Sequence, residues 1–275
     1  MRCAWKEFLD ILPRRMVREI DTAGRERLLE LRLRRGGPAE MILPGTVYRF
    51  GQNVTSEEIE YCVNTASRYS PWAATSISKG YLTSEGGHRI GICGEVVVKD
   101  GVVTGIRNVS SLCIRLARDF PGISSKAGKI TNSTLIIGAP GWGKTTLLRD
   151  LIRSVAKDRC VSVVDERGEL FPEIFTDAER VDILTGCPKA SGIDMVMRSM
   201  APEYIAMDEI TAEDDALALL KAHGSGVKLL ATAHAGSLNE FNERLVYRGL
   251  IEHNVFKTVL VLRPDKTFTL ERILT

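Results

Sequence analysis

The chain lacks the features that would place it in a membrane or in an oxidising compartment. It has six cysteines but no C-x-x-C pair, which argues against a disulfide framework and against a zinc site and suits a reducing compartment. Most of these cysteines lie in apolar segments, which predicts small core residues. No segment approaches the ~18 consecutive apolar residues that a membrane span requires, and residues 1–7 lack the apolar core of a signal peptide. We therefore expect a cytoplasmic protein, unless a partner holds it at a membrane.

The chain also has little net charge, +2 over 275 residues. Residues 1–35 hold ten Lys/Arg against six Asp/Glu, a local charge of +4, so the remainder carries about −2. Nearly every positive charge in this segment has an acidic neighbour, which favours a solvated helical face over a patch that binds polyanions. Nucleic acid is therefore not the expected partner.

One glycine-rich segment carries most of the functional information. It fits the P-loop pattern G-x-x-x-x-G-K-[ST] and lies between a short β-branched apolar run and a segment with helical spacing. Such a loop turns its backbone N–H groups toward phosphates, and the helix N-terminus adds about half a positive charge. We expect Lys144 to reach the β- and γ-phosphates of ATP and the Thr145 hydroxyl to ligate Mg²⁺. The predicted nucleotide-binding residues are Gly138, Ala139, Pro140, Gly141, Trp142, Gly143, Lys144, Thr145 and Thr146.

The part of the chain before the P-loop has a mixed pattern. Residues 4–33 are predicted to be helical with an interruption at Pro13, followed by a short strand at 40–43 and a helix at 56–69 that opens with a capping box. Two valine-rich runs flank Asp100-Gly101, a strong hairpin signal. We predict a smaller α+β domain with antiparallel strands over residues 1–120, and a linker rich in turn formers over 121–130.

Residues 131–275 alternate between strands and helices, which predicts a mostly parallel sheet with helices on both faces. Strands are expected at Thr134–Gly138, Val161–Asp165, Tyr204–Asp208 and Leu229–Ala233. Ligands in such sheets bind at the carboxyl ends of the strands, where the chain places its polar motifs.

Acidic residues end two of the predicted strands and a histidine follows a third. Asp208 is the expected Walker B carboxylate for Mg²⁺, and Glu209 would polarise the attacking water. Glu166, after Asp165, is a second candidate base. His234 is a candidate for sensing the γ-phosphate or holding the water. Together they predict phosphoryl transfer to water.

Motifs along most of the chain resemble the stage III sporulation protein AA family of endospore-forming bacteria, relatives of the type II and type IV secretion ATPases. Beside the P-loop and the Thr146-Leu147-Leu148-Arg149-Asp150 run that continues from it, the motifs are Glu30-Leu31-Arg32-Leu33-Arg34, Gly86-Gly87-His88-Arg89-Ile90-Gly91, Arg107-Asn108-Val109-Ser110-Ser111, Val164-Asp165-Glu166-Arg167, Cys187-Pro188-Lys189-Ala190, Arg198-Ser199-Met200 and Thr232-Ala233-His234.

This resemblance implies a RecA-like P-loop ATPase domain after an N-terminal domain resembling that of secretion ATPases. It implies a hexameric ring on the cytoplasmic face of a membrane channel assembly in the mother cell, with integral membrane partners such as stage III sporulation protein AB. Asp165-Glu166 would be its Asp box and His234 its His box. The chain departs from the family pattern in the loop between Glu169 and Arg180, which is shorter here. The contact that this loop makes in the family, with a neighbouring subunit or a partner, is therefore not expected with the same certainty in this chain.

An arginine supplied by a neighbouring subunit would add the missing positive charge at such a site, with an effect of ~10³–10⁵ in rate. Candidates are Arg89, Arg115 and Arg118 before the linker and Arg198 before the Walker B strand; surface arginines on an edge strand are the alternative reading. Two other functions stay open, a nucleic-acid-translocating ATPase and a nucleotide-gated scaffold with negligible turnover.

Overall fold

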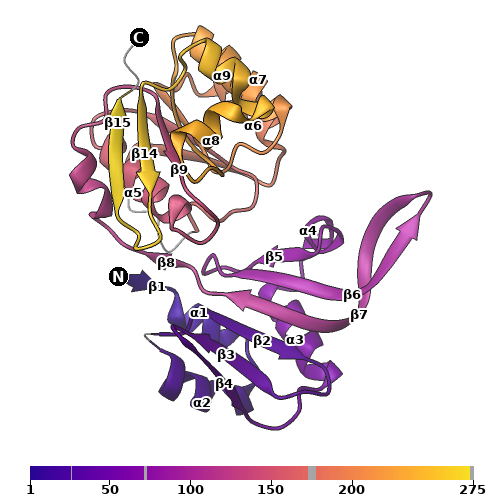
Figure 1. The fold of residues 1–275 in the computed structure, drawn as a ribbon. Coiled ribbons are helices and arrows are strands. Elements are labelled where there is room, and N and C mark those ends of the chain that lie inside the picture. The colour runs from indigo at the N-terminus through magenta and orange to yellow at the C-terminus, as the bar shows by residue number, and fades with distance from the viewer. Residues whose placement is uncertain (26, 71–72, 173–177, 273–275) are drawn as a thin grey trace. The chain divides into compact units, whose positions relative to one another are not determined.

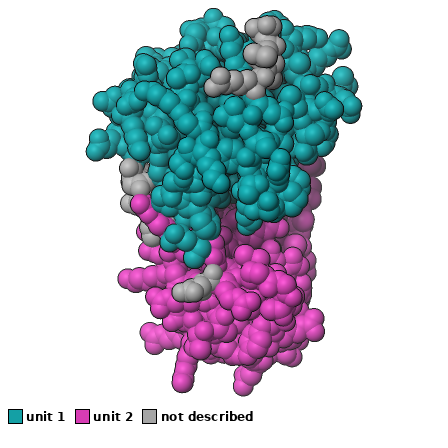
Figure 2. All heavy atoms as spheres, turned by 60° about the vertical axis from the view of Figure 1, so that its left-hand side comes forward, with its two compact units in different colours: residues 1, 119–171, 175–275 teal, residues 2–118, 172–174 magenta. Residues whose placement is uncertain are grey.

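A computed structural model describes residues 1–25, 27–70, 73–172 and 178–272 of the chain (Figure 1). The chain divides into two compact units (Figure 2). One holds residues 2–118 together with Pro172, and the other holds Met1 and most of residues 119–272. Among the described residues, no helix is both long enough and apolar enough to cross a membrane.

The first unit is built on an antiparallel sheet with the strand order β4-β3-β2-β7-β6-β5. Its helices pack around an apolar core formed by the inward residues of these strands, such as Leu31, Met41 and Ile114. The strands are β2 Glu30–Arg34, β3 Ala39–Leu43, β4 Thr46–Phe50, β5 Tyr81–Thr83, β6 Arg89–Lys99 and β7 Val102–Arg115, and the helices are α1 Trp5–Asp10, α2 Arg14–Gly24, α3 Ser56–Ala66 and α4 Ala74–Ser78.

The helix predicted over residues 4–33 is correct only in part. Pro13 separates α1 from α2 as expected, but α2 ends at Gly24 and residues 30–33 belong to strand β2. Residues 30–33 form a strand because their apolar residues alternate with polar ones: Leu31 and Leu33 are fully buried, and Glu30 and Arg32 are more exposed. A period of two fits a strand with one face on the core.

Two local predictions for this unit are confirmed. The capping box at α3 is present, since the Thr55 hydroxyl accepts from the Glu58 N–H at 3.3 Å and the Glu58 carboxylate accepts from the Thr55 N–H at 3.0 Å. β6 and β7 form the hairpin, and the turn residues Asp100 and Gly101 have φ of 51° and 76°, as a type I′ turn requires. The cysteine prediction is wrong: only Cys62 is buried, and Cys93 and Cys160 are exposed.

The second unit contains a mostly parallel sheet with the strand order β11-β10-β12-β13-β9-β14-β15; among its described strands, only β14 and β15 pair in antiparallel fashion. The predicted fold class is confirmed. The four strands expected from the sequence are present, while β11, β14 and β15 were not predicted. The strands are β9 Thr134–Ile137, β10 Val161–Asp165, β11 Val181–Thr185, β12 Tyr204–Met207, β13 Lys228–Ala233, β14 Thr258–Leu262 and β15 Phe268–Arg272.

Helices cover both faces of this sheet because successive strand residues point to opposite faces. On one face, α5 packs on a core that contains Ile136; on the other, α6 to α9 pack on a core that contains Leu135 and Ile137. The helices are α5 Lys144–Ala156, α6 Lys189–Ser199, α7 Glu213–Gly224, α8 Leu238–Glu243 and α9 Arg248–Glu252, with short 3₁₀ turns η2 Ile123–Ala127 and η4 Leu245–Tyr247.

The segment that joins the two units is tied to helix α5. Strand β8 (Arg118–Asp119), which pairs with β1 (Arg2–Cys3), leads into η2 within the predicted linker. The Asp150 carboxylate accepts from the N–H groups of Gly122 and Ser124 at 2.8 and 2.7 Å. Asp119 is fully buried and pairs with Arg153 at 2.9 Å. Residues 119–124 are therefore bound to the helix that follows the P-loop.

Candidate nucleotide-binding site

The predicted P-loop has the backbone that a phosphate-binding loop needs. It connects the buried strand β9 to helix α5, with Gly141 and Gly143 at φ of 78° and 102°, a conformation that disfavours side chains. Helix α5 begins at Lys144, and its N-cap is Gly143, which has no side chain to bind the first amides of the helix. These N–H groups, with the positive end of the helix dipole, are available to an anion.

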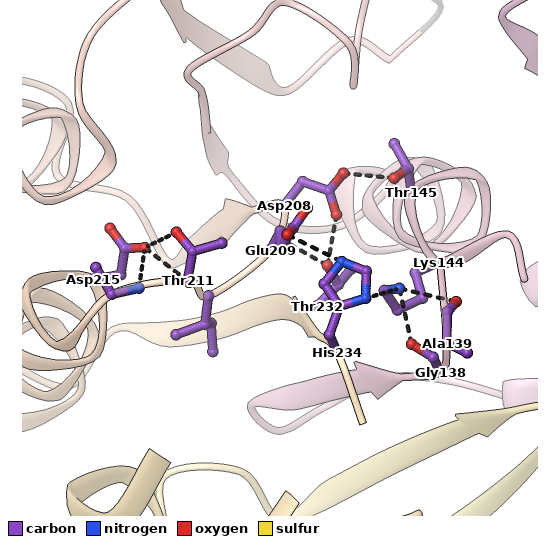
Figure 3. A network of polar contacts seen from close by, with 12 residues as sticks. Gly138, Ala139, Lys144, Thr145, Asp208, Glu209, Thr211, Asp215, Thr232 and His234 are labelled. Atoms are coloured by element: carbon purple, nitrogen blue, oxygen red, sulfur yellow. Dashed lines mark hydrogen bonds and ion pairs between the residues drawn. The ribbon is translucent and has the colours of Figure 1, made fainter. Parts of the chain in front are cut away.

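The Lys144 side chain lies inside the loop. Its ammonium donates to the carbonyl oxygens of Gly138 at 2.9 Å and Ala139 at 3.2 Å, and to His234 Nδ1 at 3.1 Å (Figure 3). Burial lowers the pKa of Lys144, while the charges of Asp208 and Glu209 act in the opposite direction. The carbonyl oxygens and the imidazole thus hold the ammonium inside the loop, and phosphate oxygens can replace them as its hydrogen-bond acceptors.

Strand β12 brings Asp208 to the P-loop. One carboxylate oxygen of Asp208 accepts from the Thr145 hydroxyl at 2.6 Å, and the other accepts from the Thr232 hydroxyl at 2.6 Å. Thr232, fully buried on the neighbouring strand β13, therefore orients the carboxylate toward the start of α5. The sequence predicts no role for Thr232, although its place in the Thr232-Ala233-His234 motif at a strand end is a usable signal.

A hydroxyl and a carboxylate side by side suit a magnesium ion. Mg²⁺ prefers oxygen ligands and is commonly held by one or two protein groups together with the phosphates of a substrate. Thr145 and Asp208 offer such oxygens next to the amides of the P-loop. The residues present therefore fit the predicted ion.

His234 connects Lys144 to Glu209. An ammonium group can only donate, so His234 Nδ1 accepts from Lys144 and the proton of the neutral ring is on Nε2. That Nε2 lies 3.0 Å from a carboxylate oxygen of Glu209. The result is a chain of ammonium, imidazole and carboxylate across the carboxyl edge of the sheet, and the Glu209 side chain remains 36% exposed and open to water.

Glu209 stands on an unusual turn of the backbone. Its φ is 58°, in the left-handed region that non-glycine residues rarely adopt. Side chains bind the backbone along this turn: the Glu209 N–H donates to the Thr232 hydroxyl at 2.8 Å, and the Glu209 carbonyl accepts from Lys189 at 2.6 Å. The next carbonyl, that of Ile210, accepts from the Tyr247 hydroxyl at 3.3 Å. The orientation of the Glu209 carboxylate is therefore determined by its surroundings.

The second acidic pair lies at the end of β10, the strand next to β12. Asp165 is 4% exposed and accepts from the N–H groups of Glu169 and Leu170 at 3.0 and 2.7 Å, so its carboxylate binds the following loop. Burial raises the pKa of Asp165, opposed by these backbone hydrogen bonds. Glu166 follows at the same sheet edge and is half-buried. The central part of the short loop, residues 173–177, lies outside the described residues.

The four candidate arginines have different surroundings. Arg115 pairs with Glu30 at 3.2 Å, Arg118 donates to the Leu28 carbonyl at 2.8 Å, and Arg89 begins β6. Arg198 is exposed in the last turn of α6, at the opposite end of that helix from Lys189. The polar network around Lys144 in the second unit thus contains Asp208, Glu209 and His234 but not Arg198.

Comparison with known proteins shows the family of this chain. The model of the family "Sporulation stage III, protein AA" matches residues 5–271. The chain belongs to this family. It is 36% identical over 281 residues to stage III sporulation protein AA of Bacillus subtilis, covering 94% of this chain and 91% of that protein.

Solved structures of secretion and pilus ATPases share the fold. The DotB ATPase of Legionella pneumophila matches with a TM-score of 0.61 at 18% identity, covering 94% of this chain and 79% of that one. The pilus retraction motor PilT with bound ADP matches with a TM-score of 0.62 at 12% identity, covering 94% and 82%. The RecA-like P-loop architecture of these ATPases is therefore the architecture of this family member.

Proposed function

We propose that this member of the sporulation stage III AA family is a Mg²⁺-dependent ATPase of the secretion type. The observation that carries the proposal is the convergence of Lys144, Thr145, Asp208, Glu209 and His234 on one P-loop through polar contacts of 2.6–3.1 Å. A lysine, a hydroxyl–carboxylate pair and a second carboxylate open to water are what phosphoryl transfer to water needs.

The proposed mechanism follows from the atoms present. Amides of the P-loop and the Lys144 ammonium bind the β- and γ-phosphates, with Lys144 exchanging a carbonyl partner for phosphate oxygen. Mg²⁺, held by Thr145 and Asp208, would neutralise charge on the phosphate oxygens. Glu209 orients the attacking water and takes its proton, and His234 holds the Glu209 carboxylate in place. Glu166 is the alternative base, because it follows the adjacent strand.

The biological setting is proposed from the family. We place the protein in a ring, most simply a hexamer, on the cytoplasmic face of the mother-cell membrane, where ATP hydrolysis energises or gates a channel assembly during endospore formation. Its partners would be integral membrane components such as stage III sporulation protein AB. Arg89, Arg115, Arg118 or Arg198 would complete the site of a neighbouring subunit.

Phosphate release with ATP and Mg²⁺, measured on the wild-type protein and on Lys144→Ala, tests the enzymatic proposal. Lys144→Ala removes a charge-assisted contact of about 1.5–3 kcal/mol, which corresponds to roughly a 10- to 150-fold loss of nucleotide affinity by calorimetry. A wild-type protein that binds ATP but releases no phosphate, even when assembled, would be a nucleotide-gated scaffold. Unchanged ATP affinity in Lys144→Ala would refute the P-loop site itself.

The ring is tested separately, by measuring mass and phosphate release together with and without nucleotide. If a neighbouring arginine completes each site, the rate per subunit rises with protein concentration as the ring assembles. A rate per subunit that stays flat from dilute monomer to assembled protein would exclude a shared site.

A further inference from the structure

Lys189 reaches the turn that carries Glu209. It is the first residue of α6, and its side chain is only 11% exposed. The ammonium donates to the Glu209 carbonyl oxygen at 2.6 Å and to the Thr211 hydroxyl at 3.2 Å, and it lies 3.6 Å from the Asp215 carboxylate. The ammonium therefore makes two hydrogen bonds and one ion pair, all three to residues in or next to the turn that carries Glu209.

The contact falls on Glu209, the residue of the polar network whose backbone lies in the left-handed region. A non-glycine residue in this region is strained and persists only when its surroundings over-determine it. At Glu209, with φ of 58°, Thr232 binds the N–H and Lys189 binds the carbonyl. Lys189 is the charged member of this pair, and a charge-assisted hydrogen bond is about twice as strong as a neutral one.

Asp215 completes the arrangement from the other side. Its carboxylate accepts from the Thr211 N–H at 3.0 Å and the Ala212 N–H at 3.2 Å, at the start of α7. It therefore binds the backbone that follows Glu209 and also gives the Lys189 charge an opposite charge, with both side chains about nine-tenths buried. Lys189 of α6 and Asp215 of α7 therefore both bind the turn from Glu209 to Ala212, and they form an ion pair with each other.

We propose that Lys189 is a positioning residue for the Glu209 carboxylate: by binding the Glu209 carbonyl, it holds the left-handed turn that directs this carboxylate to His234. The inference rests on the proposed ATPase function for its kinetic consequence. Because its ammonium binds the Glu209 carbonyl and the Thr211 hydroxyl, Lys189 acts through Glu209 and not by touching nucleotide. A residue with this role changes turnover without changing nucleotide affinity.

The test replaces the ammonium and keeps the aliphatic chain, as Lys189→Met. Loss of a hydrogen bond of about 1.5–3 kcal/mol predicts that kcat falls roughly 10- to 150-fold, while the ATP KM and the affinity for ADP stay within about two-fold. Lys189→Arg, which can still donate to the carbonyl, should restore most of the rate. The matched control is Lys221→Met on α7, an exposed lysine whose replacement should leave kcat unchanged.

A second arm shows whether Lys189 acts through Glu209. In a Glu209→Gln background, Lys189→Met should add little further loss, because coupled residues are non-additive. Equal, additive losses in both backgrounds would overturn the proposal, and so would a fall in thermal stability and ATP affinity with kcat unchanged.

A third arm does not depend on turnover. Crystal structures of the wild-type protein and Lys189→Met should show Glu209 leaving the left-handed region and its carboxylate separating from His234 in the variant; Lys189→Gln replaces Lys189→Met should the latter not fold. An unchanged Glu209 turn in the variant refutes the positioning role. If the wild-type protein does not hydrolyse ATP but the Glu209 turn changes in the variant, the proposed ATPase function is refuted and the positioning role of Lys189 is not.

Discussion

Thr232→Val is the substitution that most directly probes how the site is assembled. The Thr232 hydroxyl donates to Asp208 at 2.6 Å and accepts from the Glu209 N–H at 2.8 Å. Valine has nearly the same shape and fills the same buried position, so the packing of β13 is retained. Both hydrogen bonds are lost, one to the proposed magnesium ligand and one to the proposed base.

The upper limit of the effect follows from the burial of Thr232, which is 0% exposed; its partners Asp208 and Glu209 are half-buried, so water can replace the lost hydrogen bonds only in part. A hydrogen bond to a charged group contributes about 1.5–3 kcal/mol, and an unsatisfied buried N–H costs about 1–3 kcal/mol. If the first of these appears in the transition state, turnover falls roughly 10- to 150-fold. The second appears as a loss of folding stability of about 1–3 kcal/mol.

The assay measures phosphate release as a function of Mg²⁺ concentration for the wild-type protein, Thr232→Val and Thr232→Ser. Thr232→Val should need more Mg²⁺ for its half-maximal rate and reach a lower maximum, because Asp208 is no longer oriented. Thr232→Ser keeps the hydroxyl and should retain most of the activity. A valine variant with wild-type rate and Mg²⁺ dependence would refute the idea that Thr232 orients Asp208.

Two further predictions concern the base and a buried histidine. Glu209→Gln should keep ATP affinity by calorimetry and lose phosphate release, since the carboxylate acts on water; loss in Glu166→Gln but not in Glu209→Gln would reassign the base. His88 is fully buried, accepts from the Ala117 N–H at 3.1 Å and lies 2.8 Å from the Ala4 carbonyl, and burial lowers its pKa, opposed by the hydrogen bond to Ala4. The folded state therefore resists protonation of His88, so the free energy of unfolding should fall below about pH 6.5, by up to about 1.4 kcal/mol per pH unit. Urea unfolding between about pH 7.5 and about pH 5.5 should show a smaller decline for His88→Gln; an equal decline would contradict this account.

The sequence predicts those parts of the site that are formed by residues adjacent in the chain. The P-loop is one such run, and Asp208 and Glu209 follow directly from an apolar strand, so their meeting at one sheet edge could be expected from parallel topology. Thr232 and Lys189 act through contacts with Glu209 from 23 and 20 residues away, and spacing alone does not predict such contacts. The left-handed turn at Glu209 likewise depends on tertiary contacts and has no glycine to signal it.

The fold shows the same division. The hairpin around Asp100-Gly101 was predictable because the turn residues select it locally. Strand β2 was not, because residues 30–33 continue a charged, leucine-rich stretch whose helical and strand patterns differ only in which leucines are buried. Strands β14 and β15 also escaped prediction, although β14 pairs directly with β9.

The position of β9 has a consequence for how the protein is made. This strand, which leads into the P-loop, lies between β13 and β14, and both of those neighbours come from the last part of the chain, Lys228–Ala233 and Thr258–Leu262. During synthesis on the ribosome, β9 therefore emerges more than 90 residues before its first partner strand. The nascent chain must carry an apolar strand with two open edges over that interval, a state in which chaperones commonly intervene. Because His234 binds Lys144, the nucleotide site can be complete only after residue 234 has been translated.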